Sequence, residues 1–86
     1  MLVLIPSPLR SYTQNRTEVD AVGTTLAELL VDLEKKYPGI RFRMIDEQDQ
    51  IRQHIKIYVD MQPAEKLDIQ LKGKEQIKIV AALSGG

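Results

Sequence analysis

The segment after position 24 carries the signals of one long amphipathic helix, and no other segment does. Thr25 and Glu28 have the spacing of a capping box, in which each side chain binds a free backbone amide at the helix start. Pro38 and Gly39 end the segment, because proline cannot continue a helix and glycine adopts the conformation that follows one. One helix cannot bury its apolar face alone, so the rest of the chain has to form a sheet against it. This face consists of residues at helical spacing, namely Leu26, Leu29, Leu30, Leu33 and Tyr37.

Short apolar and alternating segments on both sides of the helix predict the strands of that sheet. Residues 1–5 form an apolar run before the first proline, and residues 16–22 alternate, as expected for a hairpin. Alternation returns at residues 54–60 and 76–83, and residues 67–71 suit a short strand between them. We therefore predict an α+β fold of the β-grasp, or ubiquitin-like, type. It has a mixed sheet of four to five strands covered by one main helix, with the first and last strands at the centre.

The remaining segments are predicted to connect these elements. The polar residues 11–15 indicate a turn, and residues 46–50 indicate a loop. Residues 40–47 suit either an alternating strand or a short second helix, and we favour the helix. A proline interrupts the pattern at residues 62–64, so no strand is predicted there.

The composition limits the functions that such a domain can have. A chain of 86 residues, of which 43% are hydrophobic, supports one compact core. The chain has 12 basic and 12 acidic side chains, whereas nucleic-acid-binding proteins usually carry a basic excess, so we expect no nucleic-acid partner. The absence of cysteine excludes disulfides, thiolate metal sites and a cysteine nucleophile. No apolar run reaches membrane-spanning length, and we expect a soluble cytoplasmic protein without a membrane partner.

No group of side chains in the sequence has the pattern of a catalytic or metal site. His54, the lone histidine, lies at a predicted strand start without the oriented partners that acid–base catalysis needs, and we assign it a surface role. Asp46, Glu47 and Asp49 cluster, but they lack the spacing of a calcium loop, so we predict that they face water. A glycine-rich phosphate loop is also absent. We therefore expect the chain to bind no metal and no cofactor of its own.

Gly85 and Gly86 end the sequence and are the strongest candidates for a reactive group. Glycine has no Cβ, so two in succession make a thin segment that can enter a narrow tunnel and present a carboxylate to another enzyme. A random chain ends this way in roughly 0.5% of cases, so the pair alone carries little weight. In the predicted fold the last strand leaves the sheet here. We expect residues 1–83 to form the domain and residues 84–86 to form a flexible tail.

A series of short motifs runs in order along the chain, and together they resemble a known family. The motifs are Pro8-Leu9-Arg10, Gly23-Thr24-Thr25-Leu26, Tyr37-Pro38-Gly39-Ile40-Arg41, Met44-Ile45-Asp46-Glu47, Ile57-Tyr58-Val59 and Ala82-Leu83-Ser84-Gly85-Gly86. In this order and spacing, the whole chain resembles the MoaD/ThiS family of ubiquitin-like sulfur carrier proteins. The stretch 41–47 resembles the molybdopterin-synthase small subunits and the cysteine-biosynthesis carriers, because the shorter thiamine-pathway carriers usually lack it.

The resemblance implies a chemical role for the terminal carboxylate. In this family an E1-like enzyme uses ATP and Mg²⁺ to adenylate the last glycine, here Gly86, and sulfur then displaces AMP. The resulting thiocarboxylate donates sulfur to a biosynthetic enzyme. The resemblance thus implies a carrier that is not itself an enzyme, with Ser84 and Gly85 as the rest of its tail. It implies two partners, the E1-like adenylating enzyme and a sulfur-accepting enzyme, and leaves open whether the product is cysteine, molybdopterin, thiamine thiazole or a modified tRNA.

A candidate docking patch lies near the predicted tail. Val80 is predicted to point away from the helix, as is Tyr58 on its own strand. Together with Ala82 and Leu83 they would form an apolar path towards the tail, which family analogy makes the docking site of the activating enzyme. The alternative is a set of isolated exposed apolar residues, which are normal on protein surfaces.

The sequence departs from the family pattern at three places. Many members have an Asn-Gly turn after the third strand, where this chain has Asp60-Met61-Gln62. An acidic turn before the last strand is replaced by Lys72-Gly73-Lys74-Glu75, and prolines common before the tail are replaced by Ala81-Ala82. The first two changes alter the surface charge near the tail and bear on the identity of the partner. They leave the tail chemistry unchanged.

Two other functions are compatible with the same fold. A ubiquitin-like modifier would use the same adenylation to join Gly86 to lysines of other proteins. A plain β-grasp interaction domain would carry a tail without function. We rank the sulfur carrier first, the modifier second and the interaction domain third.

Overall fold

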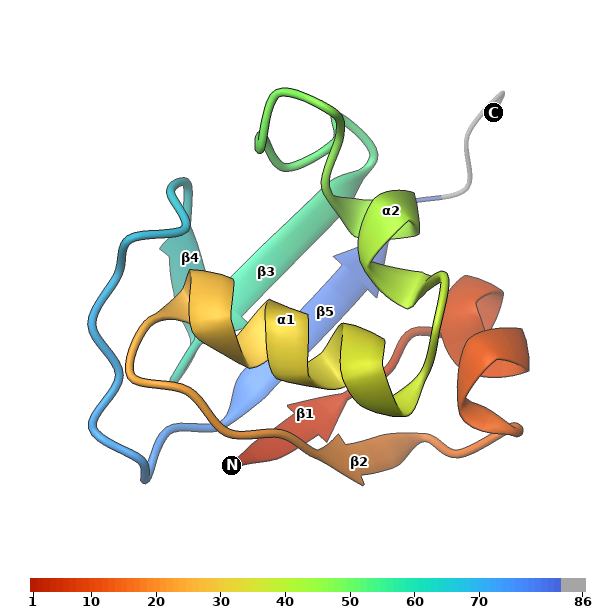
Figure 1. Ribbon diagram of the computed structural model, residues 1–86, viewed down its shortest axis with the longest axis horizontal. Helices are drawn as coiled ribbons and strands as arrows, with labels where there is room; N and C mark the ends of the chain where they lie inside the picture. The colour runs from red at the N-terminus through yellow and green to blue at the C-terminus, as the bar shows by residue number, and fades with distance from the viewer. Residues whose placement is uncertain (83–86) are drawn as a thin grey trace.

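The computed structural model describes residues 1–82, which form one mixed sheet with a helix across one face (Figure 1). The sheet has five strands, and α1 covers the face that holds the apolar core. The elements, in chain order, are β1 (Leu2–Leu4), η1 (Ser7–Thr13), β2 (Glu18–Asp20), α1 (Leu26–Lys36), α2 (Ile40–Met44), β3 (Ile55–Val59), β4 (Gln62–Ala64) and β5 (Ile77–Ala81).

The strand order is β2-β1-β5-β3-β4, which places the last strand at the centre of the sheet. β1 and β5 pair in parallel, and the other neighbouring strands pair antiparallel. This arrangement confirms the predicted mixed sheet, its single main helix and its central first and last strands. Within residues 1–82, no helix is both long enough and apolar enough to cross a membrane.

The start of α1 follows the predicted capping pattern with one difference. Thr25 Oγ1 accepts a hydrogen bond from the Glu28 amide at 3.2 Å, and the Glu28 carboxylate accepts from the amide of Thr24 rather than that of Thr25. The Thr24 hydroxyl also donates to this carboxylate at 2.7 Å, and this bond is the main cause that lowers the pKa of Glu28. The four leucines of α1 are completely buried: Leu26, Leu29, Leu30 and Leu33.

The prediction of a strand at residues 67–71 is wrong, because this segment binds the start of α1 instead. The first amides of a helix have no partner within the helix. The Leu26 amide donates to the carbonyl of Ile69 at 3.0 Å, and the Ala27 amide donates to that of Leu67 at 2.8 Å. The alternation in this segment reflects packing against the helix, since Leu71 is buried while only an isolated bridge links the segment to residue 25.

The fourth strand is β4, in the segment where no strand was predicted. Asp60 and Met61 both have left-handed φ angles, 48° and 71°, and they turn the chain back so that β4 pairs with β3. β4 is an edge strand, where a proline such as Pro63 is tolerated because one side of the strand needs no amide donor. The interruption by proline was therefore the signal of an edge strand.

The N-terminal loop also contains more structure than a turn. Residues Ser7–Thr13 form the 3₁₀ helix η1, which overlaps the predicted turn at residues 11–15. Thr13 is fully buried, and its hydroxyl oxygen lies 3.2 Å from the carbonyl of Arg10 and 2.8 Å from that of Arg16. The short helix predicted within residues 40–47 is confirmed as α2.

Candidate functional site

The point at which the chain leaves the sheet is fixed by backbone hydrogen bonds. β5 pairs with β3 as far as Ala81, which lies opposite Ile55. One residue later, the Ala82 amide donates to the His54 carbonyl at 2.8 Å. The predicted tail residues Ser84, Gly85 and Gly86, and the predicted patch residue Leu83, lie outside the described residues. The roles of these four residues therefore stay predictions. The strand end that precedes them is held by hydrogen bonds.

The face of the sheet opposite α1 brings together two of the predicted docking residues. Ile77 and Ile79 of β5 are buried beneath the helix, so the intervening Lys78 and the following Val80 point to the other face. On β3, Tyr58 lies directly opposite Lys78 of β5 and diagonal to Val80. These residues line a hollow of about 270 Å³ together with Met61 and Gln76. We call Tyr58, Met61, Lys78 and Val80 the outer patch.

A second groove continues the outer patch towards β1. It has a volume of about 540 Å³, shares Lys78 and Val80 with the first hollow, and reaches Leu4 and Pro6. Leu4 could have been assigned to this face from sequence, because it lies between the inward-facing Val3 and Ile5. Met61 could not, since its place depends on the conformation of the β3–β4 turn.

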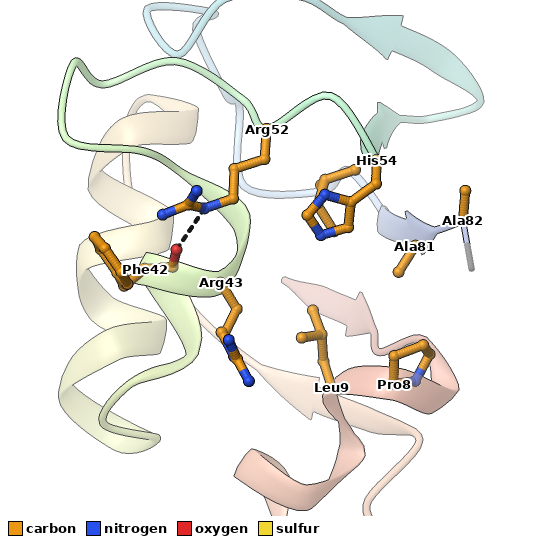
Figure 2. A pocket seen from close by; sticks show the side chains of 9 residues that line it. Pro8, Leu9, Phe42, Arg43, Arg52, His54, Ala81 and Ala82 are labelled. Carbon is orange, nitrogen blue, oxygen red and sulfur yellow. Dashed lines mark hydrogen bonds between the residues drawn. The ribbon is translucent and has the colours of Figure 1, made fainter. Parts of the chain in front are cut away.

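Ala82 lies beside a different hollow, so the structure separates it from the outer patch. This third hollow, of about 400 Å³, lies at the end of β5 (Figure 2). Its apolar lining includes Pro8, Leu9 and Phe42, and Ala81 and Ala82 border it. Its polar lining consists of Arg43, Arg52 and His54, and we call it the basic hollow.

A carboxylate of α1 positions α2 at the edge of the basic hollow. Glu34 accepts hydrogen bonds from the Gly39 amide at 2.8 Å and from the Arg41 amide at 2.9 Å. These bonds satisfy amides at the start of α2, which has no side-chain cap of its own. The result is that α2 lies beside the hollow and contributes Phe42 and Arg43 to its lining, with the Phe42 ring pointing away from the end of β5 (Figure 2).

Two arginines of the basic hollow are held by neutral partners. Arg43 donates from Nε to the Tyr12 hydroxyl at 2.8 Å, and its guanidinium carbon lies 5.9 Å from the centre of the Tyr12 ring. Arg52 donates from Nε to the Phe42 carbonyl at 2.7 Å and lies 4.6 Å from the centre of the Phe42 ring. Sequence patterns missed this cluster, because its residues come from η1, α2 and the segment before β3.

The acidic residues after α2 have a structural role. Asp46 accepts hydrogen bonds from the amides of Gln48 and Gln50, and the bond from Gln50 is the main cause that lowers its pKa. Asp49 forms an ion pair with Arg41 at 3.3 Å. Within residues 1–82, no three histidine or carboxylate side chains are grouped so that they could hold a metal ion.

Comparison with known proteins assigns this fold and tail to a family. The model of the ThiS family matches residues 3–86, nearly the whole chain. The chain belongs to the ThiS family. This ThiS-family chain is 33% identical over 89 residues to the sulfur carrier protein CysO of Mycobacterium tuberculosis and of Mycobacterium bovis. The alignment covers 98% of this chain and 96% of each relative, and it confirms the resemblance to MoaD/ThiS sulfur carriers.

Solved structures of similar proteins have the same β-grasp fold as this ThiS-family chain. The Amycolatopsis orientalis BexX/CysO complex contains a chain with a TM-score of 0.90 and 30% identity, covering 99% of this chain and 98% of that one. CysO of M. tuberculosis has a TM-score of 0.89 and 29% identity, covering 95% and 98%. The small archaeal modifier protein 1 of Methanosarcina acetivorans has a TM-score of 0.80 at 23% identity, covering 99% and 94%, which shows a shared fold alone.

Proposed function

We propose that this chain is a sulfur carrier protein whose Gly86 carboxylate becomes a thiocarboxylate. The observation that carries the proposal is the similarity to sulfur carrier protein CysO, which extends over nearly the full length of both chains. Among the acceptors left open by the sequence, CysO relatives favour the cysteine-biosynthesis branch. We place the protein in the cytoplasm, where ATP is supplied.

The chemistry needs an activating enzyme, because a carboxylate is a poor electrophile until its oxygen becomes part of a leaving group. In the first step a Gly86 carboxylate oxygen attacks the α-phosphorus of ATP, pyrophosphate leaves and an acyl-adenylate forms. In the second step a sulfide-equivalent donor attacks the acyl carbon, AMP leaves and a thiocarboxylate remains. ATP, Mg²⁺ and the acid–base groups for both steps belong to an E1-like partner.

The contribution of this chain is to present its last residues. β5 is hydrogen-bonded on both sides, by β1 and by β3, and the bond from Ala82 to His54 holds the strand end. The four residues after Ala82 reach at most about 14 Å when extended. Because Gly85 and Gly86 have no side chain, these two residues suit a narrow tunnel in the activating enzyme.

The partners follow from this division of labour. One is the E1-like adenylating enzyme, and the other is the enzyme that accepts the sulfur. A CysO of Amycolatopsis orientalis has been crystallised in a complex with BexX, which supports a carrier that works by binding another protein. We propose that the outer patch docks the activating enzyme, with Leu83 continuing the contact towards the tail.

Intact mass tests the proposed chemistry directly. The full chain is incubated with ATP, Mg²⁺, a sulfide source and the E1-like enzyme of the same organism. We expect a mass gain equal to the replacement of one oxygen by one sulfur, absent without ATP and absent in a chain that lacks Gly86. No gain under these conditions contradicts the carrier function, and lysine-linked adducts of high mass establish the modifier instead.

The variant Val80→Asp tests the docking role of the outer patch. A carboxylate there would be desolvated against the partner, so we expect kcat/KM for adenylation to fall about tenfold or more. Val31→Asp is the matched control, because Val31 is 46% exposed on α1, which covers the other face of the sheet. Circular dichroism of both variants checks folding, and equal adenylation of the two removes the outer patch from the proposal.

A further inference from the structure

The arginines of the basic hollow form no ion pair within the described residues, although Arg52 lies near enough to Asp46 to contribute to lowering its pKa. The lining of the hollow contains Arg43, Arg52 and His54 and no carboxylate. Within residues 1–82, the nearby Arg41 forms an ion pair with Asp49, whereas Arg43 and Arg52 form none. The whole chain has zero net charge, so this excess is local to the end of β5.

Contacts within the protein hold both guanidinium groups in place. Each one uses Nε for a neutral oxygen within the protein, the Tyr12 hydroxyl or the Phe42 carbonyl. The Arg52 guanidinium also lies 4.6 Å from the centre of the Phe42 ring, which restricts its side chain further. A terminal guanidinium edge that is held in this way loses little conformational entropy when it binds a carboxylate.

The position of the hollow identifies what meets it. Ala82 borders the hollow, and the four residues that follow reach at most about 14 Å. An enzyme that acts on the Gly86 carboxylate must therefore bring its own surface to within that distance of Ala82. Figure 2 shows the ring of His54 and the side chain of Arg43 bordering the space beside Ala81.

We propose that the basic hollow receives an acidic residue of the activating enzyme, whose carboxylate pairs with Arg43 or Arg52. This inference rests on the proposed function and adds a second contact, on the opposite side of β5 from the outer patch. The apolar lining of Pro8 and Leu9 suits apolar residues next to that acidic residue. The activating enzyme then holds the strand end from both faces while the last residues enter its active site.

Charge reversal in the hollow tests this docking contact. Adenylation of the full-length chain by the activating enzyme is followed by ATP–pyrophosphate exchange, with the carrier concentration varied. For Arg43→Glu and for Arg52→Glu we expect KM to rise about tenfold or more, with kcat within about twofold of the wild type. Increasing salt should raise the KM of the wild type more than that of either variant.

Lys74→Glu is the matched control, because it makes the same change in net charge at the opposite end of β5. Lys74 is exposed and precedes β5, whereas the basic hollow lies at the end of this strand. Equal KM values for Lys74→Glu and the two arginine variants would show general steering and overturn the proposal. A lower KM for the arginine variants would also overturn it, because the hollow would then hold the chain's own C-terminal carboxylate.

A peptide titration tests the proposal independently of adenylation, and its comparison of two peptides needs only the wild-type chain. The isotope-labelled wild-type chain is titrated with acetyl-Leu-Glu-Asp-Leu-amide and, separately, with acetyl-Leu-Gln-Asn-Leu-amide. We expect saturable shifts of the His54 and Ala82 amide signals with the acidic peptide alone, and their loss in Arg43→Gln. Equal shifts with both peptides, or none, would overturn the carboxylate-binding role even if wild-type adenylation is observed. If adenylation is absent, the proposed function is contradicted, and the peptide titration still decides whether the basic hollow binds a carboxylate.

Discussion

Gly23 lies between β2 and α1, where a side chain would meet the helix backbone. A Cβ at this position would lie 2.4 Å from the Leu29 nitrogen and 2.8 Å from the Glu28 carbonyl carbon. Because these are backbone atoms, no side-chain rotation can relieve the overlap. We expect Gly23→Ala to lower the free energy of unfolding by about 2–3 kcal/mol, measured by urea denaturation.

Gly73 provides the control, because its constraint is conformational rather than steric. Its φ is +96°, and a Cβ there would have no atom within 4 Å. We expect Gly73→Ala to lower the free energy of unfolding by only about 1 kcal/mol, because alanine disfavours the left-handed conformation. Equal losses of stability in the two variants would show that close approach to α1 is not what fixes glycine at position 23.

Among the elements, the β3–β4 hairpin is closed by a turn whose second residue, Met61, does not favour the conformation it adopts. Asp60 and Met61 both adopt left-handed φ angles, the conformation of a turn in which Asn-Gly is preferred. Asp60 is compensated, since its carboxylate accepts a hydrogen bond from the Gln76 amide at 2.8 Å and its own amide donates to the Gln76 carbonyl at 3.0 Å. Met61 is 88% exposed, so it gains little from packing.

Met61→Gly is therefore expected to stabilise the hairpin. Relief of the left-handed conformation exceeds the extra unfolded-state entropy of glycine, and we expect a net gain of about 0.5–1 kcal/mol in the free energy of unfolding. Urea denaturation measures the gain. Met61→Ala keeps the left-handed cost and should stay within about 0.5 kcal/mol of the wild type. A similar gain in both variants would assign the effect to removal of the exposed side chain.

The elements that the sequence predicted are those with a local pattern. α1 has capping residues, an apolar face at helical spacing and a Pro-Gly sequence at its end. β1, β3 and β5 each have an apolar run or an alternating pattern. β4 was missed because its pairing depends on the two left-handed residues before it. The alternation at residues 67–71 was assigned to a strand because a segment that packs alternate side chains against a helix has the same sequence pattern as a paired strand.

The same distinction applies to the candidate site. Val80 and Tyr58 were found from alternation, since the direction of a strand side chain is a local property. The basic hollow was not found, because η1, α2 and β5 meet there only after folding. His54 was assigned a surface role, and the structure adds that its carbonyl holds the end of β5.

Four carboxylates fix separate connections across the whole molecule, and each has a lowered pKa. The main cause is a hydrogen bond from the Thr24 hydroxyl for Glu28 and from the Val22 amide for Asp32. It is a hydrogen bond from the Gln50 amide for Asp46 and from the Lys72 amide for Glu75. All four bonds favour the ionised carboxylate, which exists in the folded state at lower pH than in the unfolded chain.

Acid is therefore expected to destabilise the fold. A group whose pKa is lower in the folded state stabilises fully above its unfolded pKa, and this contribution disappears as the pH falls through the folded value. The ordinary values are 4.5 for Glu28 and 3.8 for Asp32, so the loss should begin near these values and continue below them. Urea denaturation between about pH 7 and pH 2 measures the free energy of unfolding across this range.

Asp46→Ala isolates one of these contributions. At neutral pH the variant should be less stable than the wild type, because the amides of Gln48 and Gln50 lose their charged acceptor. The difference should shrink as the pH falls below the ordinary Asp value of 3.8, since the wild-type carboxylate then becomes neutral as well. Glu65→Gln removes the same charge from an exposed loop residue that accepts no side-chain hydrogen bond within residues 1–82, and its stability should follow the wild type at every pH. A difference between Asp46→Ala and the wild type that stays constant from neutral to acid pH would assign the loss to packing, and would contradict the role of the ionised carboxylate.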